Sequence, residues 1–293
     1  MINMGSRLVL GTANFGLKYG ISNRYKKLSK QQIYSIIQLS LDAGISTFDT
    51  AEIYGDSEES LGQLLPAKSK VISKISFNHN EKYQKNSILK KVNGSIDKLQ
   101  VDRLYGVLIH QPEKLLGYAG HEIVQELRSL KQKKMVEKIG LSIYEPEVLR
   151  QAINIFVPDI IQVPFNIFDQ RFYSSGWAKR LKEMGAEIHI RSAFLQGLLL
   201  MKKNEVPAYF QYNWPEVFER WIQYQLELGR DPDMIALGFC LQQKWADKIV
   251  CGVDNFNQLK RLLEIEKNQS KKLYSGFALE DENLIDPSKW KTI

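Results

Sequence analysis

Four side chains that can transfer protons stand at or just after apolar runs of the sequence. Asp49 ends the run ISTFD, and Tyr54 follows shortly afterwards in AEIYG. Lys74 ends VISK, and His110 ends YGVLIH. Each has an ordinary alternative interpretation, since a single lysine after a strand often reaches the surface and a histidine after an apolar run can be a satisfied core residue.

Together the four side chains would form a proton-transfer site. A tyrosine hydroxyl ordinarily has a pKa of about 10, so its ionised form needs a nearby ammonium group, and an imidazole can fix its orientation. Lys74 and His110 suit these two roles. A buried ammonium group in turn needs a counter-charge, which Asp49 supplies. We therefore interpret Asp49, Tyr54, Lys74 and His110 as catalytic residues.

The elements that would position these residues alternate between short apolar runs and longer helical segments. The predicted strands are residues 8–11, 45–49, 70–74, 103–110, 136–142, 159–164, 187–192 and 248–252. The predicted helices are residues 30–43, 57–65, 86–99, 120–133, 146–156, 175–184, 233–243 and 255–267. Alternation of this kind predicts parallel strands joined by right-handed crossovers.

Eight such units predict an α/β fold, a closed (β/α)₈ TIM barrel, as a single domain of residues 1–293 with a tail from about residue 269. Residues 198–230 interrupt the pattern and predict a loop and an extra helix over the barrel mouth. An open doubly wound sheet is disfavoured because the first loop reads GTANFG and lacks GxGxxG. The four candidate residues would then meet at the C-terminal ends of the strands, where barrels carry active sites.

Composition narrows the classes of protein. The 293 residues are 44% hydrophobic and 25% charged, which is typical of a folded, soluble chain. The formal net charge of +7 comes from dispersed lysines and arginines, so we expect no nucleic-acid surface. Two cysteines without a CxxC pattern, and no signal peptide or long apolar run, predict a cytoplasmic protein outside the membrane. His79, His110 and His121 are scattered, so we expect no metal.

The motifs resemble those of the aldo-keto reductases, which are NAD(P)H-dependent oxidoreductases on a (β/α)₈ barrel. The resemblance covers nearly the whole chain and rests on LGTANFG, AGISTFDTAEIYGDSEESLG, SKI, LIHQP and FLQGLLL in that order. It implies hydride transfer between a nicotinamide cofactor and a small-molecule aldehyde or ketone. Tyr54 would be the general acid, with its pKa lowered by Lys74. Asp49 would pair with Lys74, and His110 would orient the carbonyl group.

The same resemblance implies a set of cofactor-binding residues. These are Thr12, Ser142, Gln162, Arg191, Ser192, Phe194, Gln196, Gly197, Gly252, Asp254 and Gln258. Two positions depart from the family pattern: Ile143 replaces an asparagine, and Arg191 replaces the aromatic residue that stacks on the nicotinamide. A guanidinium group can also stack on a flat ring.

The segment IVCGVDNFNQLKRLL corresponds to the part of the family that grips the adenosine 2′-phosphate of NADPH. Asp254 would repel that phosphate but could bind a free ribose hydroxyl, or it could cap the helix that follows. Lys260 and Arg261 are further possible contacts. We expect NADPH as the cofactor, with NADH as the open alternative.

A second functional class stays open, namely a non-catalytic nicotinamide-nucleotide-binding regulatory module on the same barrel. The complete set of four catalytic candidates argues against it. Phe15, Tyr19 and Trp214 could shape an apolar substrate pocket. The sequence predicts neither a particular carbonyl compound nor an oligomeric state.

Overall fold

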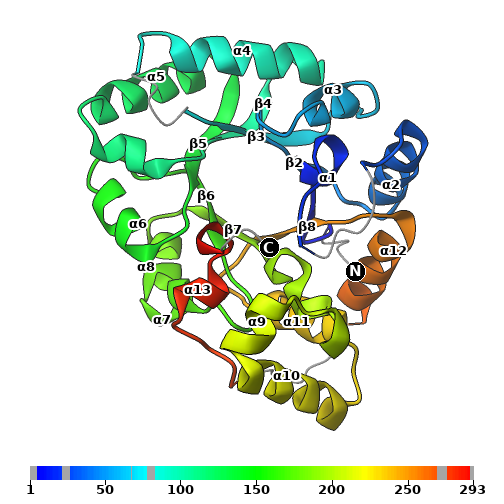
Figure 1. Ribbon diagram of the computed structural model, residues 1–293. Coiled ribbons are helices and arrows are strands. Elements are labelled where there is room, and N and C mark those ends of the chain that lie inside the picture. Colours follow the sequence, from blue (N-terminus) through cyan, green and yellow to red (C-terminus); the bar gives the residue numbers. More distant parts are fainter. Residues whose placement is uncertain (1–4, 22–26, 67, 78–82, 269–275, 291–293) are drawn as a thin grey trace.

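Parallel strands close into a barrel with helices outside it (Figure 1). The computed structural model describes residues 5–21, 27–66, 68–77, 83–268 and 276–290. Within these residues eight strands pair in chain order, and β1 pairs with β8 to close the ring. The strands are β1 Leu8–Gly11, β2 Thr47–Asp49, β3 Lys70–Ile75, β4 Leu104–Ile109, β5 Val136–Ser142, β6 Ile160–Pro164, β7 Glu187–Arg191 and β8 Lys248–Gly252. The predicted fold class is confirmed.

Helices connect the strands on the outside of the barrel (Figure 1). They are α1 Ala13–Gly16, α2 Lys30–Asp42, α3 Ser57–Gly62, α4 Ser87–Leu99, α5 Gly120–Gln132, α6 Pro146–Ala152, α7 Arg171–Ser174, α8 Trp177–Glu183, α9 Ala208–Asn213, α10 Pro215–Leu228, α11 Pro232–Leu241, α12 Phe256–Lys267 and α13 Glu282–Ile285. Short 3₁₀ turns are η1 Pro112–Leu116, η2 Leu195–Leu200, η3 Lys203–Glu205 and η4 Pro287–Lys289.

The sequence explains how the larger helices begin and which face they bury. Ser29 and Gln32 form a reciprocal capping box at the start of α2, and Pro146 occupies the first turn of α6. Each amphipathic helix turns its apolar stripe to the strands, as Ile33, Ile36 and Ile37 do in α2. The main core therefore lies between the strands and the surrounding helices.

Inside the barrel the side chains form layers. Ile72, Leu108 and Ile160 make a small buried apolar cluster of their own. At one end of this layer lies a polar network around Glu187, at the start of β7. Its carboxylate accepts hydrogen bonds from Tyr105 (2.6 Å) and Lys138, and it contacts the buried ring of His189 at 2.7 Å. The strands are thus tied together at their N-terminal ends.

The interruption between β7 and β8 contains two α-helices before α11, where the sequence predicted one. Helix α10 buries Phe218 and Trp221, and the Trp221 indole packs edge-on against Phe168 at 5.7 Å between ring centres. In Figure 1 α9 and α10 lie beside α11. Helix α3 begins at Ser57, as the sequence predicted, although Asp56 before it makes no capping hydrogen bond and pairs with Lys27.

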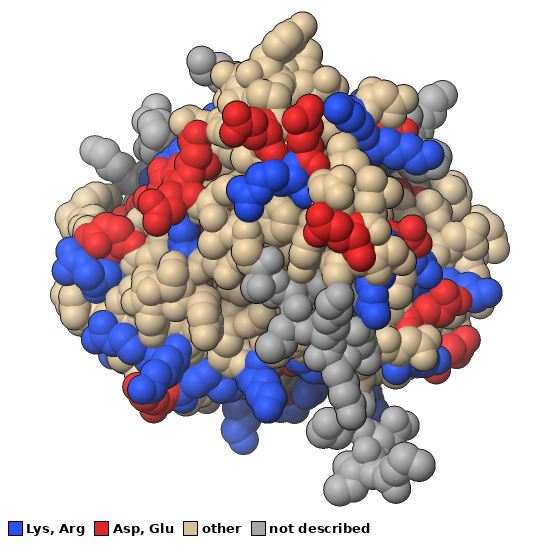
Figure 2. All heavy atoms as spheres, turned by 90° about the horizontal axis from the view of Figure 1, so that it is seen from below, with Lys and Arg blue, Asp and Glu red and all other residues tan. Residues whose placement is uncertain are grey.

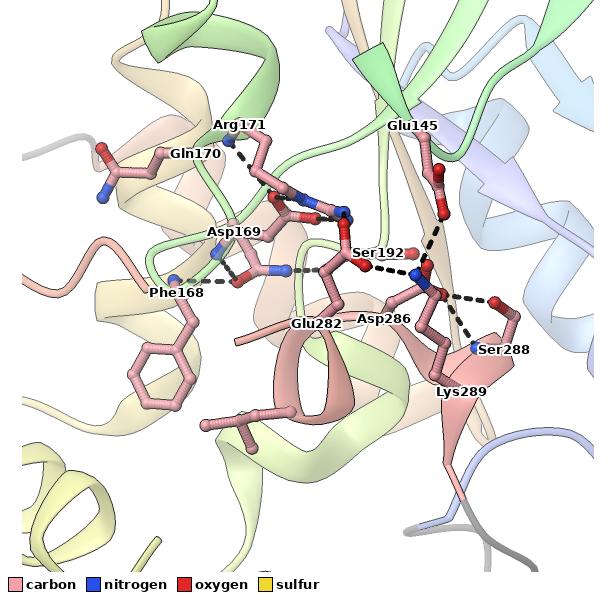
Figure 3. A network of polar contacts seen from close by, with 12 residues as sticks. Glu145, Phe168, Asp169, Gln170, Arg171, Ser192, Glu282, Asp286, Ser288 and Lys289 are labelled. Carbon is pink, nitrogen blue, oxygen red and sulfur yellow. Dashed lines mark hydrogen bonds and ion pairs between the residues drawn. The ribbon is translucent and has the colours of Figure 1, made fainter. Parts of the chain in front are cut away.

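The described part of the C-terminal tail docks on the loops of the barrel. Trp290 packs against Phe210 with ring centres 4.9 Å apart. Figure 3 shows Lys289 between Glu145, at 3.1 Å, and Glu282, while the same Glu282 also pairs with Arg171. The tail therefore fixes the loop between β5 and α6, which lies next to the candidate site.

The surface carries both signs of charge. On the face drawn in Figure 2, acidic and basic side chains occur across the whole width, with basic residues more frequent in its lower part. In the part of the chain that the structure describes, no helix is long and apolar enough to span a membrane.

Candidate active site

A cavity of about 600 Å³ opens at the C-terminal ends of the strands. Residues at or near the end of every strand line it. From β1 to β8 these residues are Gly11, Asp49, Lys74, His110, Ser142, Gln162, Arg191 and Gly252. Tyr54 joins them from the loop after β2. The four side chains that the sequence selected therefore meet in one cavity.

Lys74 and Asp49 form a buried ion pair at the base of the cavity. The Lys74 Nζ atom lies 2.5 Å from Asp49 Oδ1 and donates a second hydrogen bond of 2.9 Å to the carbonyl of Thr50. The amide of Gln162 donates to the other carboxylate oxygen of Asp49. Because both groups are buried, their pairing offsets part of the cost of removing each charge from water.

Tyr54 lies beside this pair. Lys74 Nζ is 5.2 Å from the centre of the Tyr54 ring, and the His110 ring stands edge-on to it at 6.4 Å. Burial of the hydroxyl, and next the negative charge of Asp49, raise the pKa of Tyr54 well above its ordinary value. This direction is opposite to the lowering that the resemblance implied, because burial of the hydroxyl outweighs the opposing charge of Arg191. The hydroxyl therefore holds its proton at neutral pH.

His110 is held as a neutral ring. Burial, and then the nearby charges of Lys74 and Arg191, lower the pKa of His110 to about 3. Its Nδ1 atom lies 3.0 Å from the hydroxyl of Ser76. Sequence reasoning did not select Ser76. It stands two residues after Lys74, and residues two apart along an extended chain point to the same face.

Two glycines set the path of the loop that carries Tyr54. Gly55 has φ +59°, a left-handed conformation that glycine adopts without strain. A Cβ atom on Gly16 would lie 1.7 Å from the carbonyl oxygen of Tyr54. Nearby, the Thr12 hydroxyl donates to the Asp49 carbonyl (2.9 Å) and accepts from Ser57 (2.8 Å). Thr12 thus supports the loop from within the protein.

Ser142 and Gln162 carry polar atoms that fit an amide ligand. They are opposite residues on neighbouring strands, and both are buried. The Ser142 hydroxyl and the Gln162 Oε1 atom have no hydrogen-bond partner within the described residues. Since buried polar atoms are rarely left unpaired, a hydroxyl and a carbonyl oxygen side by side suit the carboxamide of a nicotinamide ring.

Arg191 does not extend freely into the cavity. Its guanidinium group lies on the ring of Tyr144, with 3.9 Å from its central carbon to the ring centre. Sequence reasoning did not select Tyr144. Ile143, just before it, is fully buried.

Three aromatic residues were expected in a substrate pocket. Tyr19 lines the cavity, but Phe15 is fully buried and Trp214 bonds to Asp281 outside the lining.

The loop after β7 has an unusual backbone. Ser192, Leu195, Gln196 and Gly197 all have φ between +47° and +93°. Ser192, Phe194, Gln196 and Gly197, which were expected to contact the cofactor, all line the cavity. Left-handed conformations in residues other than glycine concentrate at ligand-binding loops.

The far end of the cavity is acidic and amide-rich. Asp254 accepts a hydrogen bond of 2.5 Å from Asn14, and Gln258 bonds to both the backbone and the carboxylate of Asp254. The helix cap that was offered as an alternative role for Asp254 is wrong, because the side chain of Asn255 caps α12. Gly252 and Gln258 also line this end of the cavity.

Arg261, the cation at this end, is already paired. Its guanidinium group lies 2.8 Å from Asp231 and 2.9 Å from Asp233, both at the start of α11. Lys260, the other possible contact, is exposed and does not line the cavity.

Within the described segments, no three His, Cys, Asp or Glu side chains lie close enough together to hold a metal ion. His79 lies outside those segments.

A closed parallel barrel with titratable groups at or near the C-terminal ends of its strands has the arrangement in which (β/α)₈ barrels carry active sites. Residues 7–272 match the model of the aldo/keto reductase family, and the chain belongs to that family. It is accordingly an NAD(P)H-dependent oxidoreductase.

Curated relatives and solved structures agree in class. The chain is 23% identical over 288 residues to aldo-keto reductase YhdN of Bacillus subtilis, covering 89% of this chain and 85% of that one. It is 24% identical over 188 residues to methylglyoxal reductase DkgB of Salmonella typhimurium, covering 62% and 68%. The structure of aldo-keto reductase AKR11C1 from Bacillus halodurans is similar with a TM-score of 0.71 at 19% identity, covering 93% of this chain and 95% of that one.

Proposed function

We propose that the protein reduces an aldehyde or ketone, reversibly, with Tyr54 as the general acid. The observation that carries the proposal is the meeting of a protonated tyrosine, a neutral histidine and a buried Lys74–Asp49 pair in one cavity. When bound, a nicotinamide dinucleotide supplies the hydride. The carbonyl oxygen gains negative charge as the hydride arrives, so a proton donor within hydrogen-bonding reach lowers the barrier.

The neighbours of Tyr54 have separate roles. His110, being neutral, offers a hydrogen bond to the carbonyl oxygen without competing as an acid, and Ser76 orients its ring. Lys74 stabilises negative charge on the Tyr54 oxygen once the proton has left, and Asp49 holds Lys74 in position through their ion pair. Lys74 thus makes proton transfer from Tyr54 to the substrate easier than the raised pKa of Tyr54 alone would imply.

For the cofactor, Ser142 and Gln162 would hold the carboxamide, and the loop from Ser192 to Gly197 would lie along the pyrophosphate. Gly252 and Gln258 would border the adenosine end. Thr12, which also lines the cavity and bonds to the backbone of Asp49, would border the cofactor beside the catalytic residues.

The charges at the adenosine end favour NADH over the NADPH that the resemblance put first. A 2′-phosphate needs cations, and Arg261 is engaged by two aspartates while Asp254 adds a negative charge. A free ribose 2′-hydroxyl, in contrast, can donate to a carboxylate.

Substituting Asp254 tests the cofactor preference. Asp254→Arg is expected to raise the affinity for NADPH by about ten-fold, because it replaces a repulsion by a charge-assisted hydrogen bond. Affinities for both nucleotides come from the change in nicotinamide fluorescence on binding. Asp254→Asn, which only removes the negative charge, should lie between the wild type and Asp254→Arg. Unchanged NADPH affinity in both variants would place Asp254 away from the 2′ position.

Cofactor oxidation with a carbonyl panel separates the enzyme from the regulatory module. The purified protein is mixed with NADH or NADPH and small aldehydes and ketones, including methylglyoxal, the compound in the name of one relative. We expect carbonyl-dependent loss of absorbance at the reduced nicotinamide band. Nucleotide binding without oxidation across the panel would favour the module.

A further inference from the structure

The basic side chains in the described lining of the cavity differ in whether a carboxylate pairs with them. Lys74, Arg191 and Arg261 line it. Lys74 is paired with Asp49, and Arg261 is paired with Asp231 and Asp233. Arg191 contacts no carboxylate among the described residues; its protein partners are neutral oxygens and a ring. Arg191 therefore carries a positive charge that no carboxylate in contact with it neutralises.

The contacts of Arg191 fix its plane but use few of its donors. Its two terminal nitrogens donate to the Ser192 hydroxyl and the Ile143 carbonyl, each at 3.2 Å, while Tyr144 supports one face. Its buried Nε atom has no acceptor in the described part of the chain. A guanidinium group has five N–H donors. Arg191 therefore has donors left over for an oxygen-rich ligand.

Arg191 also lies near the reacting groups. Its charge is among those that lower the pKa of His110 and oppose the rise in the pKa of Tyr54. Tyr144, which supports it, is next to Glu145, and Glu145 is held by Lys289 of the tail (Figure 3). Arg191 thus lies at the reaction end of the cavity at the end of β7, and the loop that supports its guanidinium group contacts the tail.

We propose that Arg191 recognises a carboxylate on the substrate, so that the enzyme acts on carbonyl compounds that carry a carboxylate group. This inference rests on the proposed carbonyl reduction. A planar guanidinium matches a carboxylate with two parallel hydrogen bonds, and the pairing gains strength where water is partly excluded. A substrate of this class also brings the negative charge that Arg191 lacks among its described neighbours.

Matched substrate pairs test the proposal. Pyruvate is compared with pyruvamide, and 4-formylbenzoate with 4-formylbenzamide, because each pair differs in charge but hardly in shape. The wild type is expected to favour the carboxylate by roughly ten- to a hundred-fold in kcat/KM. Arg191→Gln should lose this preference mainly through KM, and Arg191→Lys should keep part of it.

A control variant separates local recognition from net charge. Arg150→Gln removes an exposed cation that pairs with Glu147 on α6, and it should leave the preference unchanged. Equal kcat/KM for carboxylate and amide in the wild type would overturn the proposal. So would a preference that survives in Arg191→Gln, or an Arg191→Gln variant that loses only cofactor affinity, since that result assigns Arg191 to the cofactor.

Measuring substrate binding in the absence of turnover tests the role of Arg191 separately from the proposed carbonyl reduction. Calorimetry of 4-formylbenzoate and 4-formylbenzamide is done on the cofactor-loaded Tyr54→Phe protein, with and without Arg191→Lys, which retains a cation if Arg191→Gln fails to fold. Selective binding of the carboxylate supports Arg191 even if no carbonyl is reduced. Equal binding, in a protein that does reduce both aldehydes, overturns the role of Arg191 and leaves the reduction standing.

Discussion

At the scale of single residues, burial sets the protonation states of Tyr54 and His110 in opposite ways. Tyr54 is protonated because its hydroxyl is buried beside Asp49, and His110 is neutral because it is buried beside cations. Beside them, Lys74 and Asp49 form a buried ion pair at 2.5 Å. An acid and a neutral hydrogen-bonding ring are therefore available together.

The low pKa of His110 predicts how stability depends on pH. Unfolded histidine has a pKa of about 6.5, whereas the folded value is about 3, so between these pH values only the unfolded chain takes up this proton. The contribution of the neutral His110 ring to the free energy of unfolding is fully present above pH 6.5 and is lost as the pH falls towards 3. In denaturant titrations, the unfolding free energy of the wild type should fall more steeply than that of His110→Gln, by at most about 1.4 kcal/mol per pH unit. Parallel curves would contradict the assignment.

At the scale of elements, close contact between two loops positions Tyr54. The loop after β1 brings Gly16 against the backbone of Tyr54, and Gly55 takes the left-handed turn into α3. The hydroxyls of Thr12, Thr50 and Ser57 bond to one another beneath these loops. The geometry of the acid is thus set by backbone packing as well as by its neighbours.

Gly16→Ala tests this contact. The added methyl group would overlap the Tyr54 carbonyl, so the loop must move. We expect a loss of about 1–3 kcal/mol in unfolding free energy together with reduced turnover. The matched control is Gly94→Ala in the middle of α4, where a Cβ meets nothing within 4 Å. That change should stabilise by about 0.5–1 kcal/mol and leave turnover intact. Equal effects of the two substitutions would argue against the contact.

At the scale of the whole molecule, the two ends of the barrel have different tasks. The C-terminal ends of the strands carry the cavity, and the N-terminal ends are joined by the network on Glu187. Although burial opposes it, hydrogen bonds from His189, Lys138 and Tyr105 hold the pKa of Glu187 well below its usual value. Division of a barrel into a functional and a stabilising face is the general rule.

Glu187→Gln should therefore cost stability without affecting the chemistry. We expect a loss of about 1–3 kcal/mol at neutral pH, less than for a fully buried pair because the Lys138 side chain is 30% exposed. The control Glu183→Gln, on an exposed pair with Lys179, should change stability by no more than about 0.5 kcal/mol. Thermal unfolding and kcat are measured for both. A large fall in kcat with unchanged stability would contradict this division.

The sequence predicted the barrel and its catalytic candidates because those features are local. Each strand is an apolar run, and Asp49, Lys74 and His110 stand where such runs end. The features that sequence reasoning missed depend on residues brought together by folding. Arg261 meets Asp231 and Asp233 from another helix, and Tyr144 meets Arg191 across two strand ends. The direction of the Tyr54 pKa also required knowing how deeply its hydroxyl is buried.

Turnover of Tyr54→Phe tests the central claim most directly. The substitution removes one hydroxyl and leaves the ring, so we predict that kcat for carbonyl reduction falls by about 10²–10⁴-fold while the dissociation constant of the nicotinamide nucleotide changes by no more than a few-fold. A Tyr54→Phe protein that kept most of its turnover would show that another group delivers the proton.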